Sequence, residues 1–255
     1  MKAWANVDSV WKPCDSLPLS NRAFRYGMGV FETVAVRDGK ALLLEAHIER
    51  LARAASDCEC LPPNLMHFDF SDLGTGLLRI YLTAGDGAPD APFEGIAYAF
   101  FDVSEIGWNM PPLRLATSAT PYLPRPGGWK TCNYWQNIDA LAAARRTGCD
   151  DALLLNPAGM LVGASMANIF LCIDGSWITP ALETGARDGV VRSWTLQHLQ
   201  ATEELIDPSI FKHCTAAFVT NSRIGIRPAG ELDGRPLVDA CAKLRKSYFD
   251  EVFCA

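Results

Sequence analysis

The feature that most constrains the fold of this 255-residue chain is a tight turn between two apolar runs. The runs FETVAV and ALLLE flank the tetrapeptide Arg37–Lys40. Its central Asp38-Gly39 pair accepts the positive φ angles that a two-residue hairpin loop requires. We therefore expect an antiparallel hairpin in the first quarter of the chain.

A helix is expected immediately after this hairpin, from Glu45 to Glu59. Its apolar residues recur at i, i+3, i+4 and i+7, which is the spacing of one buried helical face. These residues are Ile48, Leu51, Ala52 and Ala55. Pro62-Pro63 should stop the helix, because proline lacks a backbone donor and clashes with the preceding turn.

The rest of the chain mixes strand-like and helix-like segments. Strands are expected over 77–84, 95–103, 151–156, 168–174 and 216–222, and helices over 133–146, from about 188, and over 236–253. Because hairpins and helices both connect the strands, the pattern predicts an α+β fold rather than a regular parallel α/β array.

Residues that break regular structure suggest where the chain divides. Prolines and glycines cluster around Met110–Pro112 and again between Pro121 and Gly128. We expect an N-terminal domain over 1–112, a linker over 113–128 and a C-terminal domain over 129–255.

Composition limits the possible functions. With 49% apolar and 20% charged residues, the chain can bury one large or two small cores. The net charge of −6 and the lack of a basic run disfavour nucleic-acid binding. No apolar stretch approaches the length that spans a bilayer, and no signal-peptide core is visible, so we expect a protein that is neither membrane-bound nor exported.

Cysteine and histidine usage argues against a metal site. The nine cysteines lack paired CxxC spacing, and the four histidines lack HxxxH or HExxH spacing. Scattered cysteines of this kind are typical of reduced thiols in the cytoplasm.

Lys130 is the best candidate for a reactive amine, because it lies in an apolar, aromatic and turn-rich segment. Burial would lower its pKa and make the neutral amine available for a Schiff base. The local residues alone favour the other interpretation, a surface lysine that extends its charge to solvent.

Two glycine segments could bind phosphate. Gly27-Met28-Gly29 begins like a dinucleotide loop, but Glu32 occupies the third glycine position, so that motif is incomplete. Gly189 precedes Val190 and Val191 at an expected helix start, where backbone N–H groups and the helix dipole could hold an anion. Alone, this second segment could equally be a turn.

In their order along the chain, these segments resemble the class IV aminotransferases, which include branched-chain and D-amino-acid aminotransferases and aminodeoxychorismate lyases. The resemblance rests on NRAFRYGMGVFETVAVRDGKALLLEAHIERLARAA, KTCNYWQNIDALAAARRTGCDDALLLNPAGMLVGASMANIF, GARDGVVR and FVTNSRIGIRPAGELDGRPL. It implies a two-domain α+β fold with pyridoxal 5′-phosphate in the cleft between the domains, and a homodimer.

The resemblance also implies roles for individual residues. Lys130 would be the Schiff-base lysine and the catalytic base. Arg50 would hold the cofactor phosphate, with Thr220 and the backbone N–H groups of Val190 and Val191.

Two further residues, Tyr134 and Asn168, would lie near the cofactor ring by the same resemblance. The chain departs from the family pattern elsewhere: Gly163 stands where an acid usually keeps the pyridine nitrogen protonated, and Met28 replaces the usual Asp of YGDG. The loop Thr83–Pro89 lacks the Arg and His with which D-amino-acid aminotransferases bind a carboxylate.

The leading expectation is therefore a lyase resembling aminodeoxychorismate lyase, which releases pyruvate and gives 4-aminobenzoate for folate synthesis. An amino-acid aminotransferase of the branched-chain or D-amino-acid type is the alternative. A non-catalytic or cofactor-free member is a third possibility, which Gly163 favours and Lys130 and Arg50 disfavour.

Overall fold

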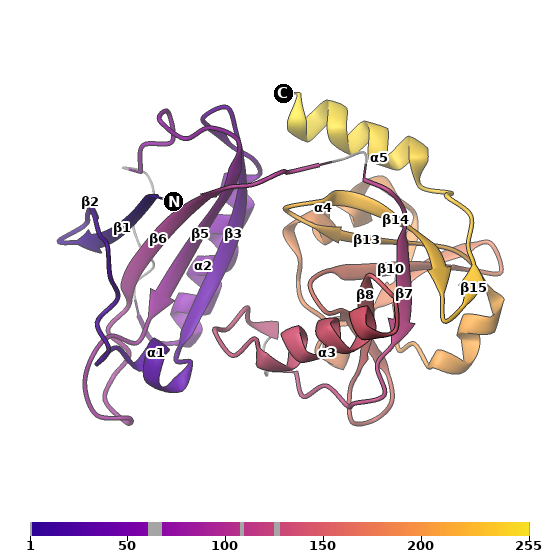
Figure 1. The fold of residues 1–255 in the computed structure, drawn as a ribbon, viewed down its shortest axis with the longest axis horizontal. Coiled ribbons are helices and arrows are strands. Elements are labelled where there is room, and N and C mark those ends of the chain that lie inside the picture. The colour runs from indigo at the N-terminus through magenta and orange to yellow at the C-terminus, as the bar shows by residue number, and fades with distance from the viewer. Residues whose placement is uncertain (1, 61–67, 108–109, 125–127, 255) are drawn as a thin grey trace. The chain divides into compact units, whose positions relative to one another are not determined.

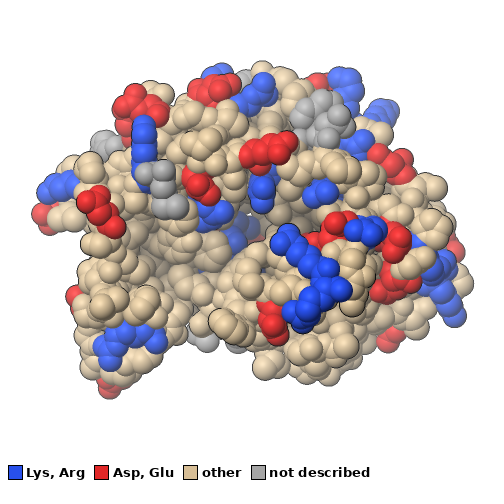
Figure 2. Space-filling model, viewed as in Figure 1, with Lys and Arg blue, Asp and Glu red and all other residues tan. Residues whose placement is uncertain are grey.

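The computed structural model describes residues 2–60, 68–107, 110–124 and 128–254, which form two compact units (Figure 1). One unit comprises residues 1–106 and 129–133, and the other comprises 107–128 and 134–255. Each unit contains strands and helices around its own hydrophobic core, as an α+β fold requires. Lys and Arg side chains are interspersed with Asp and Glu over the face drawn in Figure 2.

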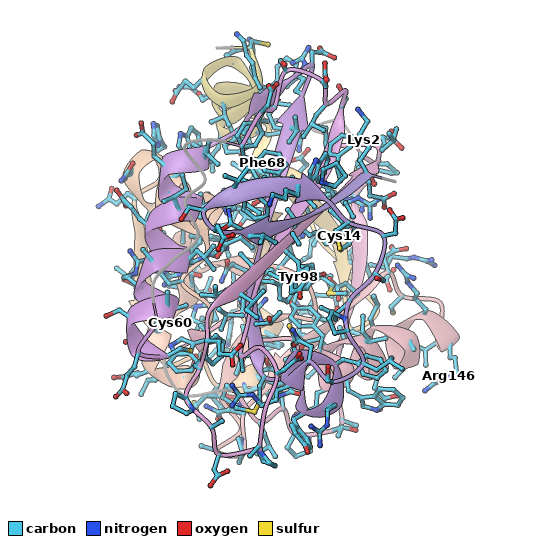
Figure 3. All side chains as sticks on the ribbon, turned by 90° about the vertical axis from the view of Figure 1, so that its left-hand side faces the viewer. Lys2, Cys14, Cys60, Phe68, Tyr98 and Arg146 are labelled. Atoms are coloured by element: carbon cyan, nitrogen blue, oxygen red, sulfur yellow. The ribbon has the colours of Figure 1, made fainter. Side chains whose placement is uncertain are left out.

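The first unit is built on a six-stranded antiparallel sheet of order β2-β1-β6-β5-β3-β4. Its strands are β1 (Lys2–Val7), β2 (Val10–Pro13), β3 (Gly29–Arg37), β4 (Lys40–Ala41), β5 (Gly76–Thr83) and β6 (Ile96–Val103), and its helices are α1 (Arg22–Tyr26) and α2 (Leu44–Asp57). Helix α2 packs against β3. The ring of Phe68, labelled in Figure 3, meets those of Trp4 and Trp11 edge-on, with centroid distances of 5.1 and 5.3 Å.

The expected hairpin is confirmed. β3 and β4 pair Arg37 with Lys40, and the two turn residues Asp38 and Gly39 have φ angles of 48° and 80°. β4 is shorter than the apolar run suggested, because the chain turns into α2 at Leu44.

The helix expected after the hairpin is also present, as α2. Leu51 and Ala55 are buried on its inner face, and Ile48 packs partly buried against the same core. The helix ends at Asp57, and the expected stop at Pro62-Pro63 lies outside the described residues.

The second unit contains a nine-stranded mixed sheet of order β12-β11-β10-β13-β14-β7-β8-β9, with β15 paired to β14. The strands are β7 (Leu113–Thr117), β8 (Asp151–Leu155), β9 (Leu161–Ala164), β10 (Asn168–Ile173), β11 (Ser176–Pro180), β12 (Ala201–Glu204), β13 (Cys214–Asn221), β14 (Gly225–Leu232) and β15 (Arg235–Pro236). The α-helices are α3 (Trp135–Arg146), α4 (Val190–His198) and α5 (Ala242–Tyr248); shorter helical turns cover Leu182–Thr184, Pro208–His213 and Phe249–Phe253.

β10 and β13 are apolar on both faces, which explains their continuous hydrophobic sequences. Ile169 and Val219 point into the main core of the unit. On the opposite face, the rings of Phe170 and Phe218 stack at a centroid distance of 4.9 Å. The pairing of β10 with β13 places Asn168 directly opposite Thr220.

The observed division of the chain differs from the boundaries expected at 112 and 128. Residues 107–128 belong to the second unit, where β7 pairs with β14 and β8. Residues 129–133 belong to the first unit, because they form backbone hydrogen bonds with β3. The C-terminal helix also starts later than expected, at Ala242, since Pro236 pairs with Glu231 of β14.

Candidate functional site

Lys130 is held against β3 by backbone hydrogen bonds on both sides. The N–H of Phe31 donates to the Lys130 carbonyl at 2.7 Å, and the N–H of Cys132 donates to the Gly29 carbonyl at 2.9 Å. Val30 and Thr131 form an antiparallel bridge between them. The Lys130 side chain is half-buried, and its Nζ lies 3.7 Å from the centroid of the Phe31 ring.

A buried charged cluster lies on the neighbouring residues of the same unit. Arg50 of α2 holds Glu32 of β3 with two parallel contacts, from Nε to Oε1 at 2.6 Å and from Nη2 to Oε2 at 2.5 Å. His47, one helical turn before Arg50, places Nδ1 2.8 Å from Oε2 of the same carboxylate. Only 3% of the Glu32 side chain and 1% of the His47 side chain are exposed.

The charge state of this cluster follows from opposing effects. Burial would raise the pKa of Glu32, but the charge of Arg50 and the hydrogen bonds from His47 and Arg50 outweigh it and lower the pKa to about 2. Burial lowers the pKa of His47 against the effect of Glu32, and the positive charges of Arg50 and Lys130 lower it further. A neutral His47 can meet Glu32 only by donating its Nδ1–H.

In the second unit, the N-terminus of α4 has the features of an anion site. No side chain caps it, so the first-turn N–H groups at Val190 and Val191 have no side-chain acceptor among the described residues. A side chain at the preceding Gly189 would place its Cβ 2.0 Å from Oδ1 of Asn168 and so would displace the Asn168 amide. Asn168 in turn donates from Nδ2 to the Arg187 carbonyl at 2.7 Å and fixes the approach to the helix.

Thr220 adds a hydroxyl to this part of the second unit. It is 1% exposed, and its Oγ1 has no hydrogen-bond partner within the described part of the chain. A buried hydroxyl is stable when it is hydrogen-bonded and costs free energy when it is not. A phosphate that accepts hydrogen bonds from α4 and Thr220 would satisfy both groups.

Tyr134 and Arg187 form a contact within the same unit. Arg187 Nη1 donates to the Tyr134 hydroxyl, and the guanidinium carbon lies 5.2 Å from the centroid of the Tyr134 ring. Tyr134 is four residues after Lys130 and immediately precedes α3.

The comparison with known families identifies the protein's class. The model of amino-transferase class IV matches residues 29–232, a range that includes Lys130, Arg50 and the other five predicted site residues. The chain belongs to the class IV aminotransferase family. It is therefore a pyridoxal-phosphate-dependent enzyme.

Relatives of this class IV enzyme include both lyases and aminotransferases. An aminodeoxychorismate lyase from Vibrio harveyi is 24% identical over 237 residues, which cover 85% of this chain and 87% of that one. A branched-chain-amino-acid aminotransferase from Pseudomonas aeruginosa is 32% identical over 130 residues, covering 47% and 42%. The crystal structure of 4-amino-4-deoxychorismate lyase from the same organism is 26% identical, covers 98% of both chains and superposes with a TM-score of 0.82.

The residues of this class IV chain fit the cofactor's chemistry. The Thr220 hydroxyl, which has no partner among the described residues, and the uncapped start of α4 suit the phosphate of pyridoxal phosphate. Thr220, Asn168, Val190, Val191 and Tyr134 belong to the second unit, while Lys130 and Arg50 belong to the first. Their direct roles at the cofactor stay predictions.

Three residues near the predicted set were not found from the sequence. In the sequence, Glu32 only interrupts a glycine motif, and His47 lacks the spacing of a metal ligand. The i, i+3 spacing of His47 and Arg50 on one helix face was the available signal. Nothing local indicated that Arg187 would contact Tyr134, because the two are 53 positions apart.

Gly163, where the family usually has an acid, lies on β9 opposite Leu154 of β8. Asp151, a buried acid, is the first residue of β8. Burial raises the pKa of its carboxyl group. Its carboxyl group accepts hydrogen bonds from the Ser165 hydroxyl and from the N–H of Ala152. Asp151 is thus engaged by its own neighbours within the unit.

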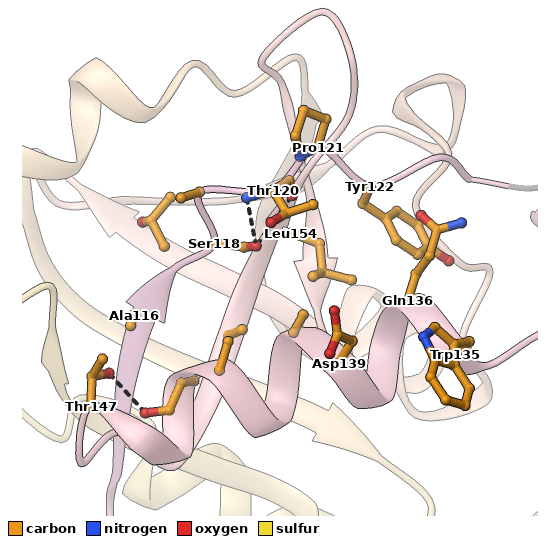
Figure 4. Close-up of a pocket in the computed structure, with 16 residues that line it drawn as sticks. Ala116, Ser118, Thr120, Pro121, Tyr122, Trp135, Gln136, Asp139, Thr147 and Leu154 are labelled. Carbon is orange, nitrogen blue, oxygen red and sulfur yellow. Dashed lines mark hydrogen bonds between the residues drawn. The ribbon is translucent and has the colours of Figure 1, made fainter.

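A separate cavity of about 290 Å³ lies between α3 and the strands β7 and β8 (Figure 4). Small residues of α3 and the hydroxyls of Ser118 and Thr120 line it, and Asp139 contributes a carboxylate. None of the seven predicted site residues is among its lining residues.

Within the described residues, no group of three or more His, Cys, Asp or Glu could hold a metal ion, and no helix has the length and apolarity needed to cross a membrane.

Proposed function

We propose that this enzyme is a lyase that converts aminodeoxychorismate to 4-aminobenzoate and pyruvate for folate synthesis. Gly163 is the observation that carries the proposal. The lyase names of the relatives from Vibrio harveyi and Pseudomonas aeruginosa support it. An amino-acid aminotransferase is the second candidate, favoured by the partial match to a branched-chain enzyme.

In this proposal the family's residue roles apply to the matching positions. Lys130 carries the cofactor and later acts as the base, and the proposed binding residues are Arg50, Val190, Val191 and Thr220 for the phosphate and Tyr134 and Asn168 for the ring. Because Nε and Nη2 of Arg50 face Glu32, its remaining N–H groups would make the charge-assisted contact to the phosphate.

Lys130 is proposed to move the proton in the reaction. When bound, pyridoxal phosphate supplies an electron sink next to the substrate's amino group. The amine of Lys130, once displaced by substrate, removes the proton on the carbon beside that group. Its Nζ lies 3.7 Å from the centroid of the Phe31 ring, and the side chain is half-buried.

Gly163 distinguishes the two candidate reactions. A carboxylate at this position would keep the pyridine nitrogen protonated and strengthen the sink, and glycine provides none. An aminotransferase needs the negative charge on the substrate to persist until a proton is returned to the cofactor side. A lyase discharges it at once, because the enolpyruvate oxygen leaves and an aromatic ring forms. A less electron-withdrawing cofactor ring therefore slows the lyase reaction less than it slows transamination.

One experiment with two substrates tests this proposal. We expect the wild-type enzyme to release pyruvate from aminodeoxychorismate in a coupled assay and to aminate its cofactor only slowly with D- or L-alanine in single-turnover spectra. Lys130→Ala should abolish pyruvate release, and borohydride should fix the cofactor to the Lys130 peptide only in the wild type. Gly163→Glu should accelerate the reaction with alanine.

The outcomes separate the alternatives. Fast amination by alanine without pyruvate release would establish the aminotransferase instead. No reaction with either substrate by a protein that binds the cofactor would count against both. Equal borohydride labelling of Lys130→Ala would remove Lys130 from its assigned role.

We further infer a homodimer located in the cytosol. The dimer is what the family resemblance implies, and the scattered cysteines suit a reducing compartment.

A further inference from the structure

Within the part of the chain that the structure describes, Arg187 is anchored by a neutral group and has no acidic partner. It is half-buried, and its guanidinium contacts the hydroxyl and the ring of Tyr134. Among the described residues, no carboxylate lies within 4.0 Å of it. A guanidinium has five N–H donors, so most of its hydrogen-bonding capacity is available to a ligand.

The other well-buried arginines of the chain are engaged differently. Arg22 donates to five backbone carbonyls of the segment 84–92, and its side chain is completely buried. Arg192 donates to Glu203 and to the Pro180 carbonyl. These two guanidinium groups are occupied by the protein itself, whereas the contacts of the Arg187 guanidinium within the described part of the chain are with the phenol of Tyr134.

The backbone of Arg187 is fixed beside the proposed phosphate site. Its carbonyl accepts from Asn168, and the uncapped turn of α4 starts three residues later. The N–H groups of this turn and the Thr220 hydroxyl are the proposed phosphate ligands of this unit. The Arg187 guanidinium is not among them, so it can serve a second anion.

We propose that Arg187 determines specificity by binding a carboxylate of the substrate. This inference rests on the proposed function for the presence of the cofactor, but it holds for either candidate reaction, because the substrates of both carry a carboxylate. A guanidinium binds a carboxylate through two parallel charge-assisted hydrogen bonds, and the Tyr134 hydroxyl orients the fork. The loop Thr83–Pro89, which lacks Arg and His, leaves this role to another residue.

Binding of matched acid and amide probes to the cofactor-loaded protein tests the proposal. One pair is 4-aminobenzoate and 4-aminobenzamide. The other is 2-methylalanine and its amide, neither of which has an α-proton to lose. Isothermal titration should show that the wild type prefers the acid in at least one pair. Arg187→Gln should weaken acid binding about ten- to a hundredfold and leave amide binding unchanged. Arg187→Lys should fall between the two, because it keeps the charge without the fork.

Two controls make the result specific. Arg146→Gln removes the same charge from an exposed position of the same unit and should behave like the wild type. The dissociation constant of pyridoxal phosphate should be unchanged in Arg187→Gln. If Arg187→Gln fails to fold, as judged by circular dichroism, the acid preference of Arg187→Lys decides.

Three results would overturn the proposal: an acid preference unaffected by the Arg187 variants, a loss of cofactor affinity equal to the loss of acid affinity, or no acid preference in the wild type. Failure of the proposed function would appear separately, as a wild-type protein that releases no pyruvate from aminodeoxychorismate.

Discussion

Arg50 and Arg187 are both positioned arginines, but one is neutralised by the protein and the other is not. Arg50 meets the buried carboxylate of Glu32 through two short contacts, with His47 on the same oxygen. Arg187 meets the phenol of Tyr134, which orients it without cancelling its charge. The guanidinium of Arg50 is thus held in an ion pair within the first unit, whereas that of Arg187 keeps its positive charge for a ligand in the second.

The partner of a guanidinium determines how strongly that guanidinium attracts an added anion. A guanidinium paired with a buried carboxylate is rigid, and removing one partner leaves the other as an uncompensated charge in the interior. A guanidinium held by a neutral hydroxyl retains its attraction for an added anion. We therefore expect Arg50 to contribute to stability as well as to phosphate binding, and Arg187 to contribute to ligand selectivity.

The largest expected effect comes from removing the Arg50 partner. Glu32→Ala should lower the free energy of unfolding by about 3–5 kcal/mol, because it leaves Arg50 and His47 buried without their acceptor. Urea unfolding measures this loss. Asp102→Ala, which removes a half-exposed partner of Arg79 in the same sheet, should cost less than about 1 kcal/mol. A similar loss in both variants would contradict the importance of burial.

Acid should weaken the same cluster. The pKa of Glu32 falls from 4.5 to about 2 on folding. Its contribution is therefore complete above pH 4.5 and is lost as the pH falls toward 2. The shift corresponds to about 3 kcal/mol. Urea midpoints measured across this range should fall less steeply in Glu32→Gln than in the wild type, and parallel curves would show that Glu32 is not the group responsible.

The smallest expected effect is on cofactor affinity, and it distinguishes the two arginines directly. Arg50→Gln, made in a Glu32→Gln background so that no charge is left unpaired, should weaken pyridoxal-phosphate binding about ten- to a hundredfold relative to Glu32→Gln alone. This equals about 1.5–3 kcal/mol for one charge-assisted contact. The preference for acid over amide probes should persist. An unchanged cofactor dissociation constant would remove Arg50 from the phosphate site.

Features that depend on neighbouring residues were predictable from the sequence. The Asp38-Gly39 turn follows from backbone conformations that few residue pairs adopt. The inner face of α2 follows from apolar spacing, and family membership follows from several ordered motifs. These features can be predicted because each depends on a few consecutive residues or on the order of motifs along the chain.

Features that join distant segments were not predictable in this way. The strand-like segment 129–133 lies against β3, about a hundred positions earlier, so the expected domain boundary at 128 could not reveal it. The same reason explains the later start of the last helix. Pro236, where the helix was expected to begin, instead pairs with β14. In both cases, backbone hydrogen bonds to a distant strand decided the outcome.

The class of the protein, the lysine and arginine expected to hold its cofactor, and the glycine at the position of the family's usual acid can be read from the sequence. Only the tertiary structure decided what surrounds those side chains. Glu32 became the counter-ion of Arg50, and Tyr134 became the anchor of Arg187, because strand and helix packing bring together residues that share no local pattern. Burial then sets their charge, since the pKa of a group depends on the solvent it loses and on the partners it gains.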